Sequence, residues 1–354
     1  MARTSADATV RTATRHGRRR HGFALGIGLP ALALLVLVFA SLLIGQYPVS
    51  GAQLASLLQA RLGGAAHQLP AILDTVVFQI RLPRVLAATL VGAALASAGA
   101  TYQGLFRNPL VSPDILGVSA GAGLGAVLGI FLSLPVLAIQ TLAFAFGLGA
   151  VFTVYLLSRL VRGHDPVLVL VLAGVVMGSL AGACISLLKY LADPYDQLPA
   201  ITFWLLGSLS SVTSADVRTT APLVILGLVP LYLLRWRVNV MSLGDEEARS
   251  LGVHAGRMRV VFITCATLMT AAVVSISGVI GWVGLVIPHI ARLLVGPNFS
   301  RLLPTSMLLG AGYLLVVDDI ARSASHAEIP LGVLTAFIGA PFFLWLLARA
   351  RRSW

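Results

Sequence analysis

The chain has 354 residues, of which 58% are hydrophobic and only 11% are charged, and its net charge is +12. Soluble proteins carry roughly 25% charged residues, so this composition excludes a disordered chain, a secreted disulfide scaffold and an ordinary cytosolic enzyme. The arginines cluster between long apolar runs, which indicates cytoplasmic loops rather than a nucleic-acid-binding surface. The sequence therefore predicts an all-α polytopic membrane protein, and no Cys/His cluster has the spacing of a metal or cofactor site.

Uncharged stretches that can form a spanning helix of about 20 residues predict ten spans. In chain order they are 23–44, 85–106, two within 115–158, 166–188, 219–234, two within 260–295, 302–317 and 329–348. A further segment, Pro199–Ser211, is too short to cross independently. We expect residues 1–21 to form a basic cytoplasmic arm and residues 22–354 a single transmembrane domain with a cytoplasmic loop at about 235–259.

The basic residues also predict the topology, because positively charged loops stay on the cytoplasmic side. An even number of spans places both termini on one side, and both tails of the chain are rich in arginine. With both ends in the cytoplasm, the inner loops and tails sum to +13 and the outer loops to −1, which together give the net charge of +12. This asymmetry supports the count of ten spans.

The sequence indicates that a partner supplies the energy for transport. The P-loop pattern G-x-x-x-x-G-K-[ST] is absent, and the only lysine, Lys189, follows a leucine. Every Asp and Glu can lie in a loop or at the end of a span, whereas ion-driven transporters usually hold acids inside the membrane. An ATP-independent secondary transporter is the alternative. An integral-membrane enzyme is a third possibility, but it would need a polar catalytic cluster that the sequence does not show.

Three blocks of sequence carry a more specific signal. The first begins with Arg81-Leu82-Pro83-Arg84 and includes 103–117, the second is 278–289, and the third starts at Glu328-Ile329-Pro330-Leu331-Gly332 and continues to 342. In this order and at this spacing, the blocks resemble the FecCD-type permease family, the membrane subunits of bacterial ABC importers for ferric siderophores, heme and cobalamin. The resemblance covers about residues 42–347.

The resemblance implies a type II ABC importer permease in the bacterial inner membrane. Two copies would form a homodimer, two ATPase subunits would bind on the cytoplasmic side, and a periplasmic substrate-binding protein would deliver the cargo. An iron chelate, either a ferric siderophore or heme, is the implied cargo, and cobalamin or another metal complex is the alternative. We expect a pathway along the dimer axis, lined by the glycine-rich second and third spans, the segment before Trp204 and the span after the loop of Arg292. Simple helix packing is the other explanation for those glycines.

The longest polar cytoplasmic loop contains a short helix that is bracketed by two glycines. Acids lie in its first turn and an arginine lies near its end, as the helix dipole prefers. The resemblance implies that this helix couples the permease to the ATPase, whereas the alternative is a solvated connecting helix. The residues concerned are Leu243, Gly244, Asp245, Glu246, Glu247, Ala248, Arg249, Leu251 and Gly252.

Three arginines on the outer side are expected to dock the substrate-binding protein: Arg81, Arg84 and Arg322. The resemblance implies that they meet glutamates of that protein, and an arginine fork pairs well with a carboxylate. We expect Pro83 to fix the start of a helix between the first two, and charge reversal of Arg84 to weaken docking without loss of stability. The alternative is an anchor at the lipid headgroups or an intrachain pair, since Asp318 lies four residues before Arg322.

Overall fold

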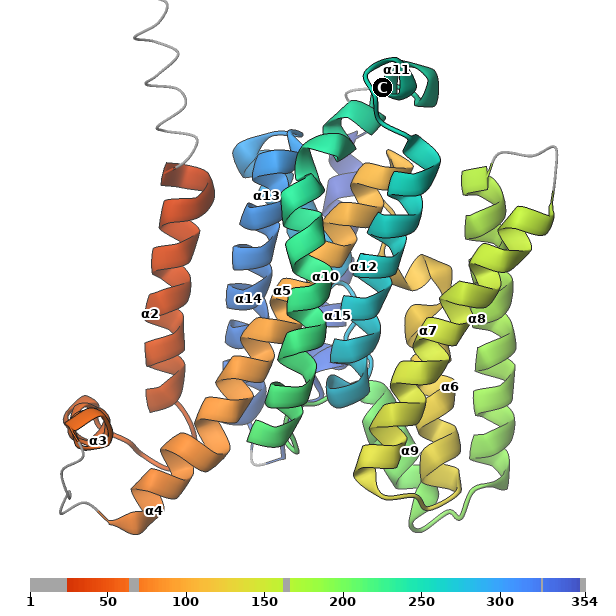
Figure 1. Cartoon of the computed structure of the whole chain (residues 1–354). Coiled ribbons are helices and arrows are strands. Elements are labelled where there is room, and N and C mark those ends of the chain that lie inside the picture. Colours follow the sequence, from red (N-terminus) through yellow and green to blue (C-terminus); the bar gives the residue numbers. More distant parts are fainter. Residues whose placement is uncertain (1–23, 64–69, 162–165, 326, 351–354) are drawn as a thin grey trace, which may run out of the picture.

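The computed structural model describes residues 24–63, 70–161, 166–325 and 327–350, and these form helices and no strand (Figure 1). The expected basic arm, residues 1–21, lies outside the described residues. The α-helices are α2 (Leu29–Leu43), α3 (Gly51–Gly63), α4 (Ala71–Asp74), α5 (Leu82–Phe106), α6 (Val118–Phe131), α7 (Val136–Leu160), α8 (Pro166–Leu191), α9 (Gln197–Leu206), α10 (Ser214–Met241), α11 (Asp245–Ser250), α12 (Ala255–Ser277), α13 (Val283–Val295), α14 (Phe299–Ser323) and α15 (Leu331–Ala350).

The described helices confirm a polytopic membrane fold. Seven helical stretches are long and apolar enough to cross a membrane, and four shorter apolar helices accompany them. Of these eleven, α9 corresponds to the segment that was expected to be too short, and the other ten correspond to the ten predicted spans. Two of the short helices, α6 and α13, follow breaks in the helical backbone at Gly117 and at 278–282. The non-α-helical backbone at these breaks spans part of the membrane thickness that the short helices do not cover.

Helix α5 forms the centre of the bundle and packs against α10, α12, α13 and α14. Its sequence is rich in Gly and Ala, which let helix backbones approach without bulky side chains between them. A Cβ atom at Gly92 would lie 2.2 Å from the backbone oxygen of Gly310, and one at Gly99 would lie 1.9 Å from that of Gly284. These glycines of the second span therefore serve helix packing.

A second group of helices, α6 to α9, packs beside the first, and α12 contacts both α6 and α7 (Figure 1). Glycines again set the distance: a Cβ at Gly125 of α6 would lie 2.3 Å from the backbone oxygen of Leu142 in α7. The two groups are thus joined along α12, a helix that is mostly buried.

The helical run around Pro83 begins earlier than predicted. The chain is helical without interruption over residues 71–106, as α4, a π-helix at Thr75–Arg81 and then α5. Proline lacks an N–H and disturbs the preceding turn of an α-helix. The wider π-turn before Pro83 accommodates this disturbance. The α-helix α5 begins at Leu82 with Pro83 in its first turn, as predicted, but the π-helix before it was not predicted and places Arg81 and Arg84 inside a continuous helical run.

Candidate functional site

The structure brings the three predicted docking arginines together at one end of the molecule, called here the arginine end. Arg81 and Arg84 lie on the helical run of α4 and α5, and Arg322 lies near the end of α14. All three line one pocket of about 370 Å³, together with Glu328 and the segment 45–47 that follows α2. Their side chains are not free at the surface, because each residue is at most 7% exposed.

Arg84 is held between two carboxylates. Its Nε donates to both carboxylate oxygens of Asp318 at 3.0 Å, and its Nη1 donates to Glu328 Oε1 at 2.7 Å. The Asp318 side chain is fully buried, whereas the Glu328 side chain is 33% exposed. Burial of one charge without its partner is strongly unfavourable, so the pair of Arg84 and Asp318 ties α5 to α14, and Glu328 forms the outer, exchangeable side of the arrangement.

Arg322 and Arg81 attach the end of α2 to the same cluster. Arg322 Nη2 donates to the backbone oxygen of Ser41 at 2.6 Å and also pairs with Asp319, which accepts a hydrogen bond from Ser41 Oγ at 2.6 Å. Arg81 donates to three backbone oxygens of the α2 end and the segment after it, those of residues 42, 43 and 47. The expected partner of Arg322, Asp318, is at 3.9 Å and therefore a weaker partner than Asp319.

These contacts bear on one sequence-based expectation. Charge reversal of Arg84 would place a third carboxylate beside Asp318 and Glu328, and it would leave a fully buried aspartate without its cation. Loss of one partner from a buried pair costs about 3–5 kcal/mol. These contacts argue against the prediction that such a variant keeps its stability, and they give Arg81, Arg84 and Arg322 a structural role whatever else they contact.

The predicted short helix lies at the opposite end of the molecule, called here the α11 end (Figure 1). It spans Asp245–Ser250, with the three acids in its first turn and Arg249 in its last, as the sequence indicated. Gly244 has a φ of 139° and Gly252 a φ of 79°, values that few residues with a side chain adopt. The two glycines therefore define the bounds of the helix.

Two contacts fix α11 on the bundle, and a local hydrogen bond closes the turn after it. Arg259 of α12 donates from Nη1 and Nη2 to the two oxygens of Asp245 at 2.9 and 2.8 Å, a bidentate pair that holds the first turn. Ala248 is fully buried against the bundle, and its backbone oxygen accepts from Val253 N at 2.8 Å. The bidentate pair was not predicted, because Asp245 and Arg259 are separated by fourteen residues across a turn.

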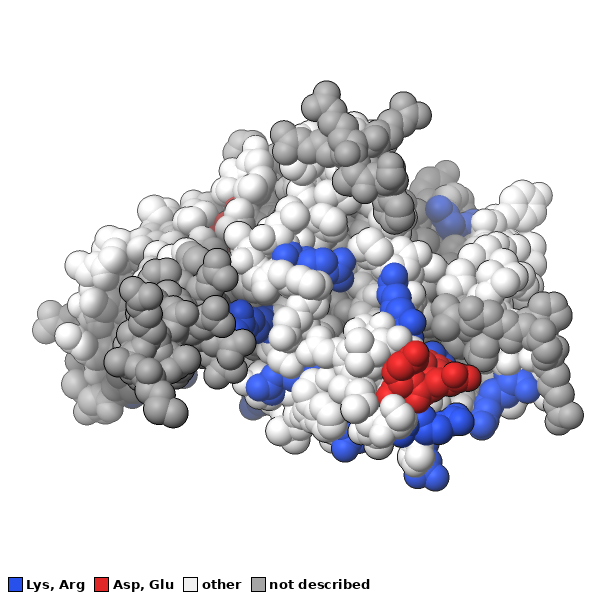
Figure 2. Space-filling model, turned by 90° about the horizontal axis from the view of Figure 1, so that it is seen from above, with Lys and Arg blue, Asp and Glu red and all other residues white. Residues whose placement is uncertain are grey.

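The remaining surface of α11 faces outward. Leu243 and Leu251, which flank the helix, are 61% and 59% exposed. The first turn of α11 contains three acids. Figure 2 shows acidic side chains at this end gathered in one patch, with basic side chains around it. A pinned helix that carries acids, with two exposed leucines at its ends and arginines around it, offers a partner protein both apolar and charged contacts.

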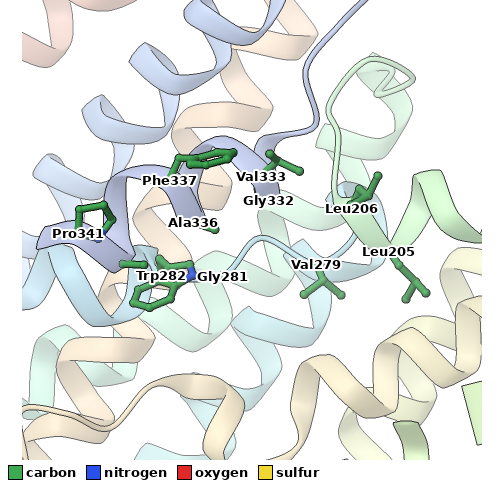
Figure 3. A pocket seen from close by; sticks show the side chains of 11 residues that line it. Leu205, Leu206, Val279, Gly281, Trp282, Gly332, Val333, Ala336, Phe337 and Pro341 are labelled. Carbon is green, nitrogen blue, oxygen red and sulfur yellow. The ribbon is translucent and has the colours of Figure 1, made fainter. Parts of the chain in front are cut away.

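A third feature is an apolar cavity of about 630 Å³ (Figure 3). It is lined by the end of α9, the segment 279–282 and α15; the lining residues are Leu205, Leu206, Val279, Gly281, Trp282, Gly332, Val333, Ala336, Phe337, Ala340 and Pro341. No lining residue is charged.

Backbone hydrogen bonds join the three helix breaks around this cavity. Leu331 N donates to Gly207 O at 2.9 Å, and Ser208 N donates to Ser277 O at 2.8 Å. Trp282 has a φ of 70°, which is unusual for an aromatic residue and costs on the order of 1–3 kcal/mol. Gly339 permits this conformation, since a Cβ there would lie 2.6 Å from Trp282 Cβ. The cavity wall is thus a strained and closely packed structure.

The lining only partly agrees with the expected pathway. The segment around Trp204 contributes its two following leucines, but neither the glycine-rich α5 and α6 nor α14 lines the cavity. The glycines of α5 and α6 pack against neighbouring backbones instead, as shown above for Gly92, Gly99 and Gly125. The segment 279–282 and α15 were missed as lining, although the Gly-x-x-Gly pattern of 278–281 is typical of an interrupted helix. Within the described residues, no group of three or more His, Cys, Asp and Glu side chains is placed to hold a metal ion.

Known proteins share this sequence and fold. The chain is similar to the molybdate import system permease protein MolB of Haemophilus influenzae, with 41% identity over 322 residues that cover 91% of this chain and 95% of that protein. It is also similar to a probable iron chelatin transport system permease protein of Helicobacter pylori, with 43% identity over 279 residues, 79% of this chain and 84% of that protein. A solved metal-chelate type ABC transporter in an inward-facing conformation superposes with a TM-score of 0.81 at 40% identity, covering 90% of this chain and 97% of that one.

The FecCD transport family matches residues 33–349, which is nearly the whole chain. The match spans the arginine cluster, the apolar cavity and α11, and it agrees with a polytopic helical fold. The family is one of transport proteins rather than enzymes. The chain belongs to the FecCD transport family and is a membrane-spanning permease of the ABC-importer type.

Proposed function

We propose that this permease imports an iron chelate across the bacterial inner membrane, with energy from ATP hydrolysed by a separate partner subunit. The observation that carries the proposal is α11, an exposed helix that Arg259 and the buried Ala248 hold rigidly on the bundle. A rigid connection transmits motion between subunits, whereas a flexible loop would absorb it. Leu243 and Leu251 supply apolar surface for contact with the ATPase, and the residues from Asp245 to Gly252 form the coupling segment.

The same arrangement supports an orientation with the α11 end in the cytoplasm and both termini on that side. The exposed arginines at this end, among them Arg249, Arg257 and Arg301, agree with the positive-inside rule. The arginine end then faces the periplasm. We further propose that two copies of the chain form a homodimer that binds two ATPase subunits, with the apolar cavity of α9 and α15 facing the shared axis.

The arginine cluster supports docking of a periplasmic substrate-binding protein by exchange of ion pairs. Glu328 is the only one of the three cluster acids with substantial exposure, and it closes Arg84 from the outside. An acidic side chain of the binding protein reaches Arg84 by displacing Glu328, while Asp318 keeps the arginine in place. Arg81, held by backbone carbonyl groups alone, and Arg322 line the same pocket and add positive charge to it.

The cavity favours a cargo with an apolar periphery. Its walls are aliphatic and aromatic, and apart from the indole N–H of Trp282 their side chains offer no hydrogen-bond donor for the oxygens of a small hydrated anion. An iron chelate, whose ligand covers the charge of the metal, fits these walls. A second candidate is an oxyanion such as molybdate, which the relative with 41% identity over 91% of this chain favours.

Reconstitution tests both the class and the cargo. The permease is placed in proteoliposomes with its ATPase and binding protein, and uptake of a labelled ferric chelate, heme, cobalamin and molybdate is compared with and without ATP. The proposal expects uptake of an iron chelate that requires all three proteins. Uptake of the chelate in the absence of ATP would favour a secondary transporter. Uptake of molybdate and of none of the other compounds would show that the cargo is an oxyanion and not an iron chelate.

A further inference from the structure

A groove between α7 and α12 has no role in the functions described above. It encloses about 220 Å³ and is lined by Leu148, Val151, Phe152, Tyr155, Val260, Ile263, Thr264 and Thr267. Phe152, Val260 and Thr264 are exposed along it. The residues of α7 from Leu148 to Tyr155 extend over about 10 Å at 1.5 Å per residue. The groove is therefore a narrow, mainly apolar one that runs along α7 and α12.

An arginine from each helix lies at the α11 end of this groove. Arg159 is four residues after Tyr155 and so on the same face of α7, and its Cζ lies 5.7 Å from the Tyr155 ring. Arg257 is three residues before Val260 and so on the same face of α12. Both are exposed, and neither forms an ion pair with another described residue.

Two neighbouring arginines at this end are held by other parts of the chain. Arg259, two residues after Arg257, pairs with Asp245 on the side of α12 that faces α11. Arg107 donates to the backbone oxygen of Met241 at 2.7 Å. Among the described residues no carboxylate pairs with Arg159 or Arg257, which lie on the two helices that line the groove.

We propose that this groove binds an anionic phospholipid, with the phosphate between Arg159 and Arg257 and an acyl chain along Val151, Val260 and Thr264. Basic pockets between transmembrane helices bind anionic headgroups, because a guanidinium donates two parallel hydrogen bonds to a phosphate. The apolar walls exclude water around the chain, and a soluble anion would gain nothing from them. The lipid fills the space between α12 and α7 of the second helix group. Helix α12 follows α11 in the chain. The proposal does not depend on the cargo or on the ATPase.

Native mass spectrometry of the full-length permease in detergent tests the site without partner subunits. The protein is freed of lipid and titrated with phosphatidylglycerol and with phosphatidylcholine that carries the same acyl chains. We expect tighter binding of phosphatidylglycerol. In the double variant Arg159→Gln with Arg257→Gln, this binding falls roughly 25-fold, a factor of about 5 for each arginine.

Two further variants separate the groove from general charge effects. The double variant Arg235→Gln with Arg301→Gln removes the same charge from the same end, but outside the groove. It should lower the affinity for phosphatidylglycerol by less than a third of the 25-fold loss expected in the groove variant. Thr264→Trp fills the groove, keeps both arginines and should also weaken binding of phosphatidylglycerol. Equal binding of the two lipids by the wild-type protein would overturn the proposal. So would a loss in the groove variant no larger than that in the control, or full binding by Thr264→Trp.

Discussion

Replacement of Glu328 by Gln should strengthen docking of the substrate-binding protein. Glu328 Oε1 accepts a hydrogen bond from Arg84 Nη1 at 2.7 Å. The Glu328 side chain is 33% exposed, and the Arg84 side chain is 8% exposed. If docking requires an incoming acid to displace Glu328, the free energy of this pair opposes docking in the wild-type protein. The amide keeps the shape of the side chain but gives up the ionic attraction, so the displacement becomes easier.

The magnitude follows from the exposure of the pair. Fully exposed ion pairs contribute about 0.2–1 kcal/mol, and hydrogen bonds to charged groups in less exposed settings contribute about 1.5–3 kcal/mol. With one partner a third exposed, solvent screening reduces the Glu328 contribution to about 1 kcal/mol. Since about 1.4 kcal/mol corresponds to tenfold in affinity, the Glu328→Gln variant should bind roughly fivefold tighter.

Surface plasmon resonance on the permease–ATPase complex in nanodiscs measures this affinity. Asp74→Asn is a matched control, because Asp74 is an acid at the same end that pairs with Arg61 at 3.3 Å instead of Arg84. The control should change affinity much less than Glu328→Gln. Unchanged or weaker binding by Glu328→Gln, or an equal gain in the control, would refute the exchange of ion pairs at Arg84.

Three further predictions concern coupling, the buried pair and helix packing. Leu243→Asp with Leu251→Asp should weaken ATPase binding at least tenfold, since burial of each leucine is worth about 1.5–3 kcal/mol; isothermal titration calorimetry measures this. Asp318→Asn should lower the free energy of unfolding in detergent by about 3 kcal/mol, well above the effect of Glu328→Gln in the same denaturant titration. Gly99→Ala should destabilise the protein by about 1–3 kcal/mol through overpacking, whereas Gly149→Ala, with open space around it, should not.

The apolar runs were sufficient to predict the fold because membrane crossing imposes length and composition on each helix. The predicted span at 85–106 and the helix that begins at Asp245 both appear in the structure. Helix starts were harder: the sequence around Pro83 resembles a helix N-terminus, yet a π-turn carries the helix through it. A change in hydrogen-bond register of this kind has no composition signal.

The contacts of the candidate site could not be predicted in the same way. Arg84 pairs with Asp318 across 234 residues, and only the fold decides which acids reach it. The i, i+4 spacing suggested Asp318 as the partner of Arg322, but Asp319 is the closer carboxylate because the buried Ser41 holds it there. Helical spacing fixes which side chains are neighbours on one helix, and it contains no information about competition from other helices.

The ratio of cargo imported to ATP hydrolysed tests the central claim, that α11 couples this permease to a separate ATPase. The ratio is measured in proteoliposomes for the wild-type complex and for a variant in which residues 245–252 are replaced by a Gly/Ser linker of equal length. We expect no ATP hydrolysis by the permease alone, coupled import by the wild-type complex, and a ratio near zero in the linker variant, since a flexible linker does not transmit motion. Import by the linker variant at the wild-type ratio would contradict the claim.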